Sequence, residues 1–514
     1  MAGAGRVSSQ KGVLRGMGSA ALVFFVSLAG ATQEGAVAEA GAALPPGEPT
    51  TYSKDTISRL AFGSCNKQYL PQPMWSTVEG LSPDVWLWMG DVVYVDMQED
   101  GRFDAQSHGS IEKMKEAYAQ QLANRDYQRF LGKVPRVEGV WDDHDFGVND
   151  VGKHLSDHPG RVAVFLDFLG VGPEDPRRGG GTLYASHVFG EAPKQVKVIT
   201  LDLRTQRDDY YAFNIAHRGF KFASKLGAFS RLFSSMICLG SEYDGSVMDE
   251  DQWQWLEGQL KDSEAAVHVL VSSIQVMTSN PLVESWGHFP HSRRRLLDLL
   301  RRTNPSGLVI LSGDVHHAEL SSGWRARAPS SPEGEGADLD EKKTPSDADC
   351  AAHSAAGRGN GAAKRGVVEV TTSGMTHSCL SSHGRWMCAG CLDRWNQHRW
   401  RDDTYYLDMN FGDIEIEWAE GKAAPQPARM TVTVRDINGT AILPIVDYFG
   451  GGKEPADMQS AQQQEQQQQQ PERTFLDRSP PPECVEPVLP GGCTARMFSA
   501  LAAFVIAVVR EALA

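Results

Sequence analysis

The chain has 514 residues, of which 50 are basic and 65 acidic, and its formal net charge is −15. This balance argues against a nucleic-acid scaffold, which would carry a basic stripe. It leaves an anionic substrate open, because carboxylates that bind metal ions add to the negative charge. Hydrophobic residues make up 41% of the chain and include 12 Trp, which is ample for one large packed core.

The start of the chain, residues 1–31, has the pattern of a secretory signal peptide. Basic residues precede an apolar run at 17–30, and Ala29 and Ala31 form a small-x-small cleavage site. An uncut membrane anchor is the alternative, although the apolar run is short for a membrane span. Either way, we expect the body of the protein in the secretory pathway, outside the cell, at its surface or in an endomembrane lumen.

Composition divides the rest of the chain. A flexible leader at 32–56 precedes the main domain at 57–448, which a disordered insert at 325–365 interrupts. A Gln/Pro-rich linker at 449–483 follows, and then a segment at 484–514 that contains cysteines and an apolar tail. The tail is compatible with a transmembrane anchor, a GPI signal or neither, so a membrane tether stays open.

Within the main domain, short apolar runs alternate with helical patterns, which predicts α/β layering. The runs that we expect as strands are Arg59–Ser64, Asp84–Met89, Val137–Trp141, Val196–Leu201, Val267–Ser273 and Leu308–Ser312. Helices are expected at Asp249–Asp262, capped by Asp249, and at His291–Arg302. Alternation typical of antiparallel strands is found in Val367–Thr372, Phe411–Trp418 and Met430–Asp436.

Four loops that each follow an apolar strand carry side chains suited to metal binding. They are GSC at 63–65, GDVVY at 90–94, WDDHD at 141–145, which continues to Asn149, and SGDVHH at 312–317. In an open α/β sheet, ligands gather at the carboxyl ends of strands. A lone Asp after a strand is usually a turn or cap, but the carboxylates of the third loop repel one another unless a cation or hydrogen bonds compensate. Together the loops predict a metal site.

The chemistry of phosphoester hydrolysis explains these residue types. Hydroxide attacks an anionic phosphoester poorly, and a pair of metal ions removes this difficulty by lowering the pKa of water and polarising the phosphoryl oxygens. One carboxylate must bridge the two ions, and Asp91 is placed to do so. A nearby histidine can donate a proton to the leaving oxygen or stabilise the phosphate, and His144 is the natural candidate. We therefore expect Asp91 and His144 to be catalytic.

In chain order, these motifs resemble the PhoD-like branch of the metallophosphatases, also called alkaline phosphatase D, in the calcineurin-like metallophosphoesterase superfamily. The ordinary branch has D-x-H, GD-x-x-D/N, GNH-E/D and GH-x-H, where this chain has GSC, GDVVY, DDHD and GDVH. LDLRTQR at 201–207 resembles the D-x-R-x-x-R segment of the branch. Further similar segments are DQWQWLEGQL at 251–260, SSIQ at 272–275 and ESWGHFPHSRRRLL at 284–297. The resemblance covers roughly residues 57–320.

The resemblance implies an α/β fold, a four-layer α/β/β/α metallophosphoesterase sandwich. It also implies hydrolysis of phosphate mono- or diesters by a metal-bound hydroxide, with two or more metal ions. The implied metal ligands are Cys65, Asp91, Tyr94, Asp143, Asp314 and His316, with Asn149 as a further candidate. The thiolate, phenolate and imidazole suit Fe³⁺, the oxygen ligands of a second ion suit Ca²⁺ or another divalent ion, and Asp91 bridges them. His144 and Arg204 would contact the phosphate, although an Arg204–carboxylate structural pair is the alternative.

The chain departs from the family pattern in three places. The third loop ends in Asp145 instead of Glu, and Val92 and Val93 stand where some members place an Arg. An additional FGV element separates the third loop from Asn149. These departures bear on phosphate affinity, on substrate range and on the role of Asn149.

The chain has 8 Cys, which favour disulfides in an oxidising compartment. Side chains able to form disulfides or bind a metal lie close together in the sequence at His377, Cys379, His383, Cys388 and Cys391. They are compatible with disulfides or with a zinc site. We expect a separate small loop closed by Cys484 and Cys493.

Other functions remain open from the sequence. One alternative is a specialised phosphodiesterase or a phospholipid-headgroup hydrolase. Another is a non-catalytic, metal-stabilised cell-surface protein in which the ligands only staple the fold, and a third is an adhesive or cell-wall protein with a Gln/Pro-rich tail. The presence of His144 favours an enzyme over a purely structural metal protein.

Overall fold

The structure is a computed structural model that describes residues 51–100, 104, 109–211, 223–236, 240, 242–325, 366–396, 398–399, 404–420, 429–443 and 446–448. These residues belong to one compact unit within Gly41–Ala514. The predictions for 1–31, 449–483 and 484–514 lie outside the described residues, as does nearly all of the predicted insert at 325–365. No helix within the described part of the chain has the length and apolarity to cross a membrane.

The strands of this part of the chain are β1 (Thr51–Ser53), β2 (Arg59–Gly63), β3 (Val85–Met89), β4 (Arg136–Val140), β5 (Ala185–Phe189), β6 (Val196–Thr200), β7 (Val267–Val271), β8 (Leu308–Ser312), β9 (Ala318–Arg325), β10 (Gly366–Thr371), β11 (Tyr405–Tyr406), β12 (Asn410–Glu417), β13 (Arg429–Asp436) and β14 (Val446–Tyr448). The helices are α1 (Trp75–Gly80), α2 (Ile111–Ala123), α3 (Arg125–Leu131), α4 (Asp143–Phe146), α5 (His158–Phe168), α6 (Arg177–Gly180), α7 (Ala223–Met236), α8 (Glu250–Leu260), the 3₁₀ turn η2 (Trp286–His288), α9 (Pro290–Thr303), α11 (Cys379–His383) and α12 (Arg385–Trp395).

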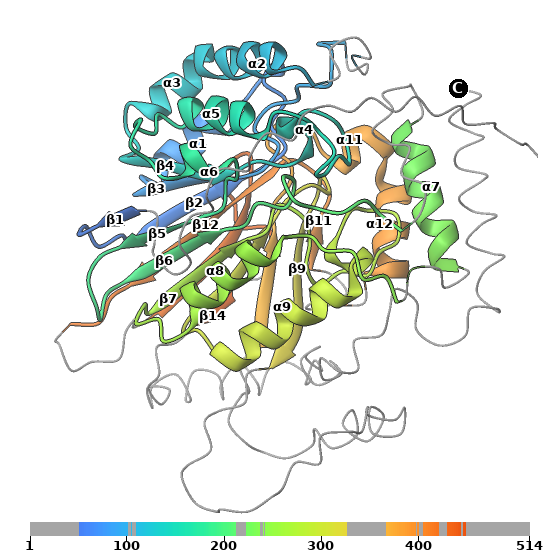
Figure 1. Cartoon of the computed structure of the whole chain (residues 1–514). Helices are drawn as coiled ribbons and strands as arrows, with labels where there is room; N and C mark the ends of the chain where they lie inside the picture. The colour runs from blue at the N-terminus through green and yellow to red at the C-terminus, as the bar shows by residue number, and fades with distance from the viewer. Residues whose placement is uncertain are drawn as a thin grey trace, which may run out of the picture. The chain divides into compact units, whose positions relative to one another are not determined.

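Two sheets organise the described residues (Figure 1). Sheet A has 8 strands in the order β1-β5-β6-β7-β8-β10-β9-β11, and sheet B has 6 in the order β14-β13-β12-β2-β3-β4. β2, β3 and β4 are parallel neighbours in sheet B, as are β6, β7, β8 and β10 in sheet A. Parallel order places the carboxyl ends of these strands at one edge of each sheet.

The alternation of side chains along the strands shows which elements pack against each face of sheet A. Val267, Val269 and Val271 of β7 belong to the same buried cluster as the strands of sheet B, whereas Leu270 belongs to the cluster that contains helices α8 and α9. Successive residues of a strand point to opposite faces, so one face of sheet A lies against sheet B and the other under these helices. Figure 1 shows α8 and α9 along sheet A, and α1, α2, α3 and α5 beside sheet B.

An aromatic cluster joins the helices to sheet B. Trp86 and Trp88 of β3 contact Trp75 of α1 edge-on, with ring centroids 5.1 and 5.5 Å apart, and Phe130 of α3 stacks on Trp75 at 5.0 Å. Such pairs contribute about 0.5–1.5 kcal/mol each beyond the area that they bury. The cluster fixes β3, whose carboxyl end leads directly into Gly90 and Asp91.

The strands expected from the sequence are present with shifts of at most about two residues at their ends. The helix capped by Asp249 is confirmed, since its side chain accepts from the backbone N–H of Gln252. Two expectations were wrong. β1 pairs in parallel with β5, so the ordered body begins inside the predicted leader at 32–56. β10 pairs in parallel with β8 and only its other edge is antiparallel, because alternation alone does not specify strand direction.

Candidate metal centre

The two sheets meet where their parallel strands end. The hydroxyl of Ser64, which follows β2, donates to the carbonyl of Thr372, which follows β10, at 2.8 Å. The backbone N–H of Met375 donates to the carbonyl of Ser64 at 3.2 Å, and that of Gly313 to the carbonyl of Ser273. The bonds of Ser64 therefore tie loops of the two sheets together, and the Gly313–Ser273 bond ties two loops at the end of sheet A.

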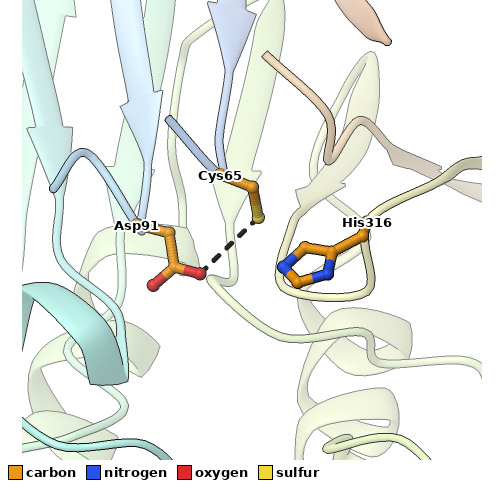
Figure 2. Close-up of side chains that lie close together, drawn as sticks. All are labelled: Cys65, Asp91 and His316. Atoms are coloured by element: carbon orange, nitrogen blue, oxygen red, sulfur yellow. Dashed lines mark hydrogen bonds between the residues drawn. The ribbon is translucent and has the colours of Figure 1, made fainter. Parts of the chain in front are cut away.

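Asp91 is the residue around which the acidic and histidine side chains gather. Among the described residues, three groups whose ligand atoms all lie within 4.8 Å of one another contain it: Cys65–Asp91–His316, Asp91–Asp143–His144 and Asp91–Asp142–Asp143–Asp314. Figure 2 shows the first of these groups, in which Cys65 Sγ is 3.6 Å from Asp91 Oδ2. A carboxylate common to adjacent groups is the arrangement that a two-metal centre needs.

Tyr94 and a second histidine complete the Cys65 side of the cluster. Tyr94 Oη is 3.1 Å from Asp91 Oδ2 and 3.2 Å from Nε2 of both His316 and His377. The two histidine Nε2 atoms are themselves 3.1 Å apart. Sequence reasoning placed His377 with the nearby cysteines and missed it here. It lies in the loop after β10, a parallel strand end like the others, but the sequence of β10 carries no signal of that direction.

Several candidate ligands have a strained backbone. The φ angles of Cys65, Asp91, Asp314 and His316 are 60°, 52°, 72° and 58°, in the left-handed region. For non-glycine residues this costs about 1–3 kcal/mol each, and such conformations cluster at functional sites. Gly90 precedes Asp91 with a φ of 96°, and a Cβ there would come within 2.6 Å of Asp142 Cβ. These backbone conformations lower the stability of the fold, and they direct the ligand side chains toward the cluster.

Burial and mutual repulsion disfavour the charged forms of the acidic groups in the cluster. Burial raises the pKa of the Cys65 thiol, and the Asp91 carboxylate raises it further. Burial likewise raises the pKa of Asp91 and Asp314, and neighbouring carboxylates add to the effect. Asp91 Oδ1 is buried without a hydrogen-bond partner in the described structure. A thiol, a phenol, imidazoles and crowded carboxylates with an unpaired oxygen form a donor set that fits metal cations.

His144 lies beside this cluster and is held by a carboxylate that the sequence did not single out. Its Nδ1 is 2.7 Å from Asp96 Oδ1, and its ring stacks on Tyr94 with centroids 4.1 Å apart. Burial opposes protonation of His144, but the carboxylates of Asp96, Asp143 and Asp91 outweigh it and raise its pKa. Because Asp96 occupies Nδ1, proton exchange with a substrate would use Nε2.

Arg204 is at the base of the cluster and is fully buried. Its Nε donates to Asp142 Oδ1 at 2.6 Å, and its Nη2 donates to Glu284 Oε2 at 2.5 Å. Ser273 also donates to Asp142 Oδ1, at 2.6 Å. The structure thus places Arg204 in the arginine–carboxylate pair named as the alternative, where it keeps Asp142 oriented.

Replacing Arg204 by Ala is therefore expected to lower the free energy of unfolding by about 3–5 kcal/mol, because the buried carboxylate of Asp142 loses its arginine partner and that of Glu284 loses one of its two. Denaturant unfolding measures this loss. As a control, Arg129→Ala removes an exposed arginine bonded to Glu79 and Asp126 and should cost about 1 kcal/mol or less. Equal losses in the two variants would contradict a structural role for Arg204.

The loop after α4 places the remaining predicted residues. The backbone N–H of Asn149 donates to Asp96 Oδ2 at 2.9 Å, which ties this loop to the partner of His144. The backbone N–H of Asp150 donates to Asp143 Oδ2 at 2.6 Å, and the Asp150 side chain accepts from Arg231. Asp145 closes a capping box with Asp142 at the start of α4, so this residue supports the helix.

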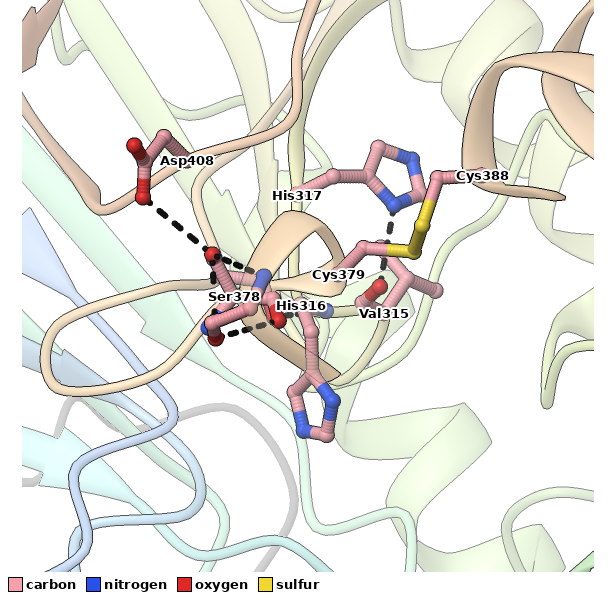
Figure 3. Close-up of a disulfide and its surroundings, with 9 residues drawn as sticks. Val315, His316, His317, Ser378, Cys379, Cys388 and Asp408 are labelled. Carbon is pink, nitrogen blue, oxygen red and sulfur yellow. Dashed lines mark hydrogen bonds between the residues drawn. A yellow bond between two sulfur atoms is a disulfide. The ribbon is translucent and has the colours of Figure 1, made fainter. Parts of the chain in front are cut away.

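The cysteines after β10 form a disulfide. Cys379 is bonded to Cys388, and Cys391 is a free thiol (Figure 3). The zinc interpretation for this group was wrong, because the disulfide takes two of its three sulfurs and His377 points to Tyr94 instead.

The chain is similar to a known protein family and to a solved structure. A protein-family model described as PhoD-like phosphatase matches residues 60–334. A solved structure titled "Structure of PhoD" is similar to the chain at 15% identity and a TM-score of 0.46, covering 80% of this chain and 74% of that one. No curated protein matches the sequence. From the family match, the chain belongs to the PhoD-like phosphatase family.

Proposed function

We propose that the chain is a metal-dependent phosphoric ester hydrolase that acts on phosphate mono- or diesters. The observation that carries the proposal is Asp91, which is shared by three of the four ligand groups among the described residues. It is flanked by Cys65 and Tyr94 on one side and Asp143 on the other. Family membership supports phosphoester hydrolysis as the activity. The packing of sheet A between sheet B and helices α8 and α9 supports the four-layer α/β/β/α sandwich.

The ligand groups suggest how metal ions would be held. Cys65, Tyr94 and His316 would hold one ion, to which the structure adds His377 as a candidate, and this set suits Fe³⁺. Carboxylates from the loops after β4 and β8 would hold another, suited to Ca²⁺ or a similar divalent ion, with Asp91 common to both. When bound, such ions activate water and polarise the phosphoryl oxygens.

Other side chains of the site orient His144 for its role in the reaction. Asp96 fixes the His144 ring through Nδ1, and the Tyr94 ring stacks against it, so the imidazole has one orientation. In that orientation, protonated His144 can contact the phosphate and give a proton to the leaving oxygen through Nε2. A protein whose metal ions only stabilised the fold would not need this aligned histidine–aspartate pair.

Since Arg204 is engaged by Asp142 and Glu284, a different basic side chain is the candidate for a phosphate contact beside His144. Lys67 follows Cys65 by two residues, is half-buried, and its Nζ is 5.1 Å from the centroid of the Tyr94 ring. It lies in the electrostatic field of Cys65 and Asp91. We assign the phosphate contact to Lys67.

Lys67→Met should therefore lower kcat/KM by about 10- to 100-fold, because a charge-assisted contact to the phosphate is lost. Steady-state kinetics on a generic phosphoester measures the change. Lys113→Met, which removes a surface lysine paired with Glu116, is the matched control and should leave the kinetics unchanged. Unaltered kinetics in Lys67→Met would remove the assignment.

The proposed activity is tested with the purified full-length protein on a generic phosphate monoester and a generic phosphodiester, beside analysis of its metal content. Hydrolysis of one or both, lost on metal removal and restored by metal addition, is expected. The ratio of the two rates sets the mono- or diester preference and tests the specialised phosphodiesterase alternative. A metal-loaded protein without hydrolytic activity would contradict the proposal and favour the non-catalytic alternative.

The proposed location in the secretory pathway has its own test. The sequon Asn438-Gly-Thr440 lies in the turn after β13, with the Asn438 side chain exposed. If the chain enters the secretory pathway, Asn438 should carry an N-linked glycan. An endoglycosidase that removes N-glycans should then lower the apparent mass of the secreted wild type but not of Asn438→Gln. An unglycosylated, intracellular product would contradict the location.

A further inference from the structure

The disulfide Cys379–Cys388 lies next to the half of the metal centre that contains His316 and His377. Cys379 follows His377 by two residues, and its backbone N–H donates to the carbonyl of His316 at 2.6 Å. Figure 3 shows this contact region, with the disulfide joining Cys379 to the helix that carries Cys388. The bridge and the two candidate ligands are therefore connected through one short stretch of backbone.

The contact with Cys379 matters because the His316 backbone is strained. Its φ of 58° is maintained only if the surroundings hold both of its polar groups. The N–H of His316 donates to Ser373 Oγ at 2.7 Å, and its carbonyl accepts from Cys379. The position of Cys379 is thus one of two restraints on the backbone of a candidate ligand.

The helix that begins at Cys379 is short and is anchored mainly at its start, where Ser378 caps it and donates to Asp408 and Leu380 packs against Leu407. α11 has 5 residues and none of its side chains is buried, and isolated helices of this length are unstable. Its hydrogen bonds to the rest of the fold include one from the Leu380 N–H to the Leu407 carbonyl at 3.0 Å. A covalent link to a better-anchored element would therefore add a strong restraint on Cys379 to these contacts.

α12 is that better-anchored element. Cys388 and Leu392 are buried against Leu407, and the side chain of Asn396, just after the helix, donates to the buried carboxylate of Glu319 on β9 at 2.7 Å. We infer that the Cys379–Cys388 disulfide is a positioning device that transmits this anchoring to His316 and His377 and keeps them in the metal centre. The inference rests on the proposed metal-dependent function.

The test compares wild type, Cys379→Ala/Cys388→Ala and Cys391→Ala as full-length, metal-loaded proteins. Alanine at 379 keeps the backbone N–H, so the double variant removes only the bridge. Cys391→Ala removes a nearby thiol outside the bridge and is the control. The readouts are the rate of metal loss to excess EDTA, hydrogen exchange of residues 374–383, and kcat and KM. Each protein is measured with and without the reductant TCEP.

We expect the double variant to lose metal at least tenfold faster than wild type, to exchange faster at 374–383, and to show a lower kcat with KM within twofold. TCEP should bring wild type and Cys391→Ala to the same state and leave the double variant unchanged. If the double variant does not fold, TCEP treatment of folded wild type gives the same comparison.

Equal metal loss and equal exchange with and without the bridge would overturn the inference, as would a TCEP effect that persists in the double variant. Metal loss that depends on the bridge in a protein without hydrolytic activity would leave the positioning role standing and reject the proposed function. A protein that binds no metal in any state would reject both.

Discussion

Replacing Asp91 by Asn is expected to lower kcat/KM by about 1000-fold, roughly 4 kcal/mol of transition-state stabilisation, and to reduce the amount of bound metal. Asp91 is common to three of the four ligand groups in the described part of the chain, so losing its charge affects those three candidate metal positions together. Asn is preferred to Ala here because it tolerates the left-handed φ of 52°. Metal analysis and steady-state kinetics measure both effects.

The same substitution should stabilise the protein once the metal is removed. Asp91 is buried with one oxygen unpaired, and burial raises its pKa above the ordinary value. A raised folded-state pKa means that its contribution to stability is full below the unfolded pKa and is lost as the pH rises through the folded pKa. At neutral pH, metal-free Asp91→Asn should therefore unfold at a higher temperature than metal-free wild type.

The control for Asp91 is Asp413→Asn. Asp413 is equally buried but pairs with Arg435 in sheet B and belongs to none of the ligand groups in the described part of the chain. We expect this variant to be less stable and to keep its metal and its activity per folded molecule. Full activity and metal content in Asp91→Asn would remove the shared-carboxylate role.

Replacing His144 by Asn should lower kcat by about 10²- to 10⁴-fold while the metal content stays near that of wild type. His144 touches the cluster through Asp91 and Asp143, but its orientation by Asp96 and Tyr94 fits proton transfer better than metal binding. His268→Asn is the matched control. His268 is a buried residue of β7, and its ring forms hydrogen bonds with Ser306 and Ser263. It should reduce stability and leave kcat unchanged.

The contact between Asp96 and His144 allows the acid role of His144 to be tested through the pH dependence of kcat. Asp96 contributes to the raised pKa of His144, so Asp96→Asn should lower that pKa. If protonated His144 is the acid, activity falls on the alkaline side as it loses its proton, and the alkaline limb of the kcat profile should move to lower pH in Asp96→Asn. A limb that stays in place, or wild-type kcat in His144→Asn, would contradict the acid role.

Much of the site could be predicted because its ligands follow strands that the sequence marks clearly. β2, β3 and β8 are largely apolar runs followed by polar loops, so the apolar pattern placed these loops at strand ends. The family resemblance then named Cys65, Asp143 and His316 as metal ligands. Parallel pairing within each sheet then brings these ends to one edge. The fold class was predictable for the same reason.

The parts that the sequence did not reveal depend on strand direction and long-range contacts. His377 was assigned to the wrong group because nothing in β10 itself indicates that it runs parallel to β8 across the insert. Asp96 was overlooked because an aspartate five residues beyond Asp91 has no local signature, and its role depends on His144, 48 positions away. Arg204 could be assigned to carboxylates only once Asp142 and Glu284 were seen beside it.

The most direct test of the account is a crystal structure of the metal-loaded protein with anomalous maps recorded at the iron edge and away from it. The account predicts an anomalous peak, strongest at the iron edge, among Cys65, Tyr94 and His316, and a second metal peak on the other side of Asp91 near Asp143 and Asp314. Metal density elsewhere, or a fully active crystal sample with no metal peak on Asp91, would contradict it.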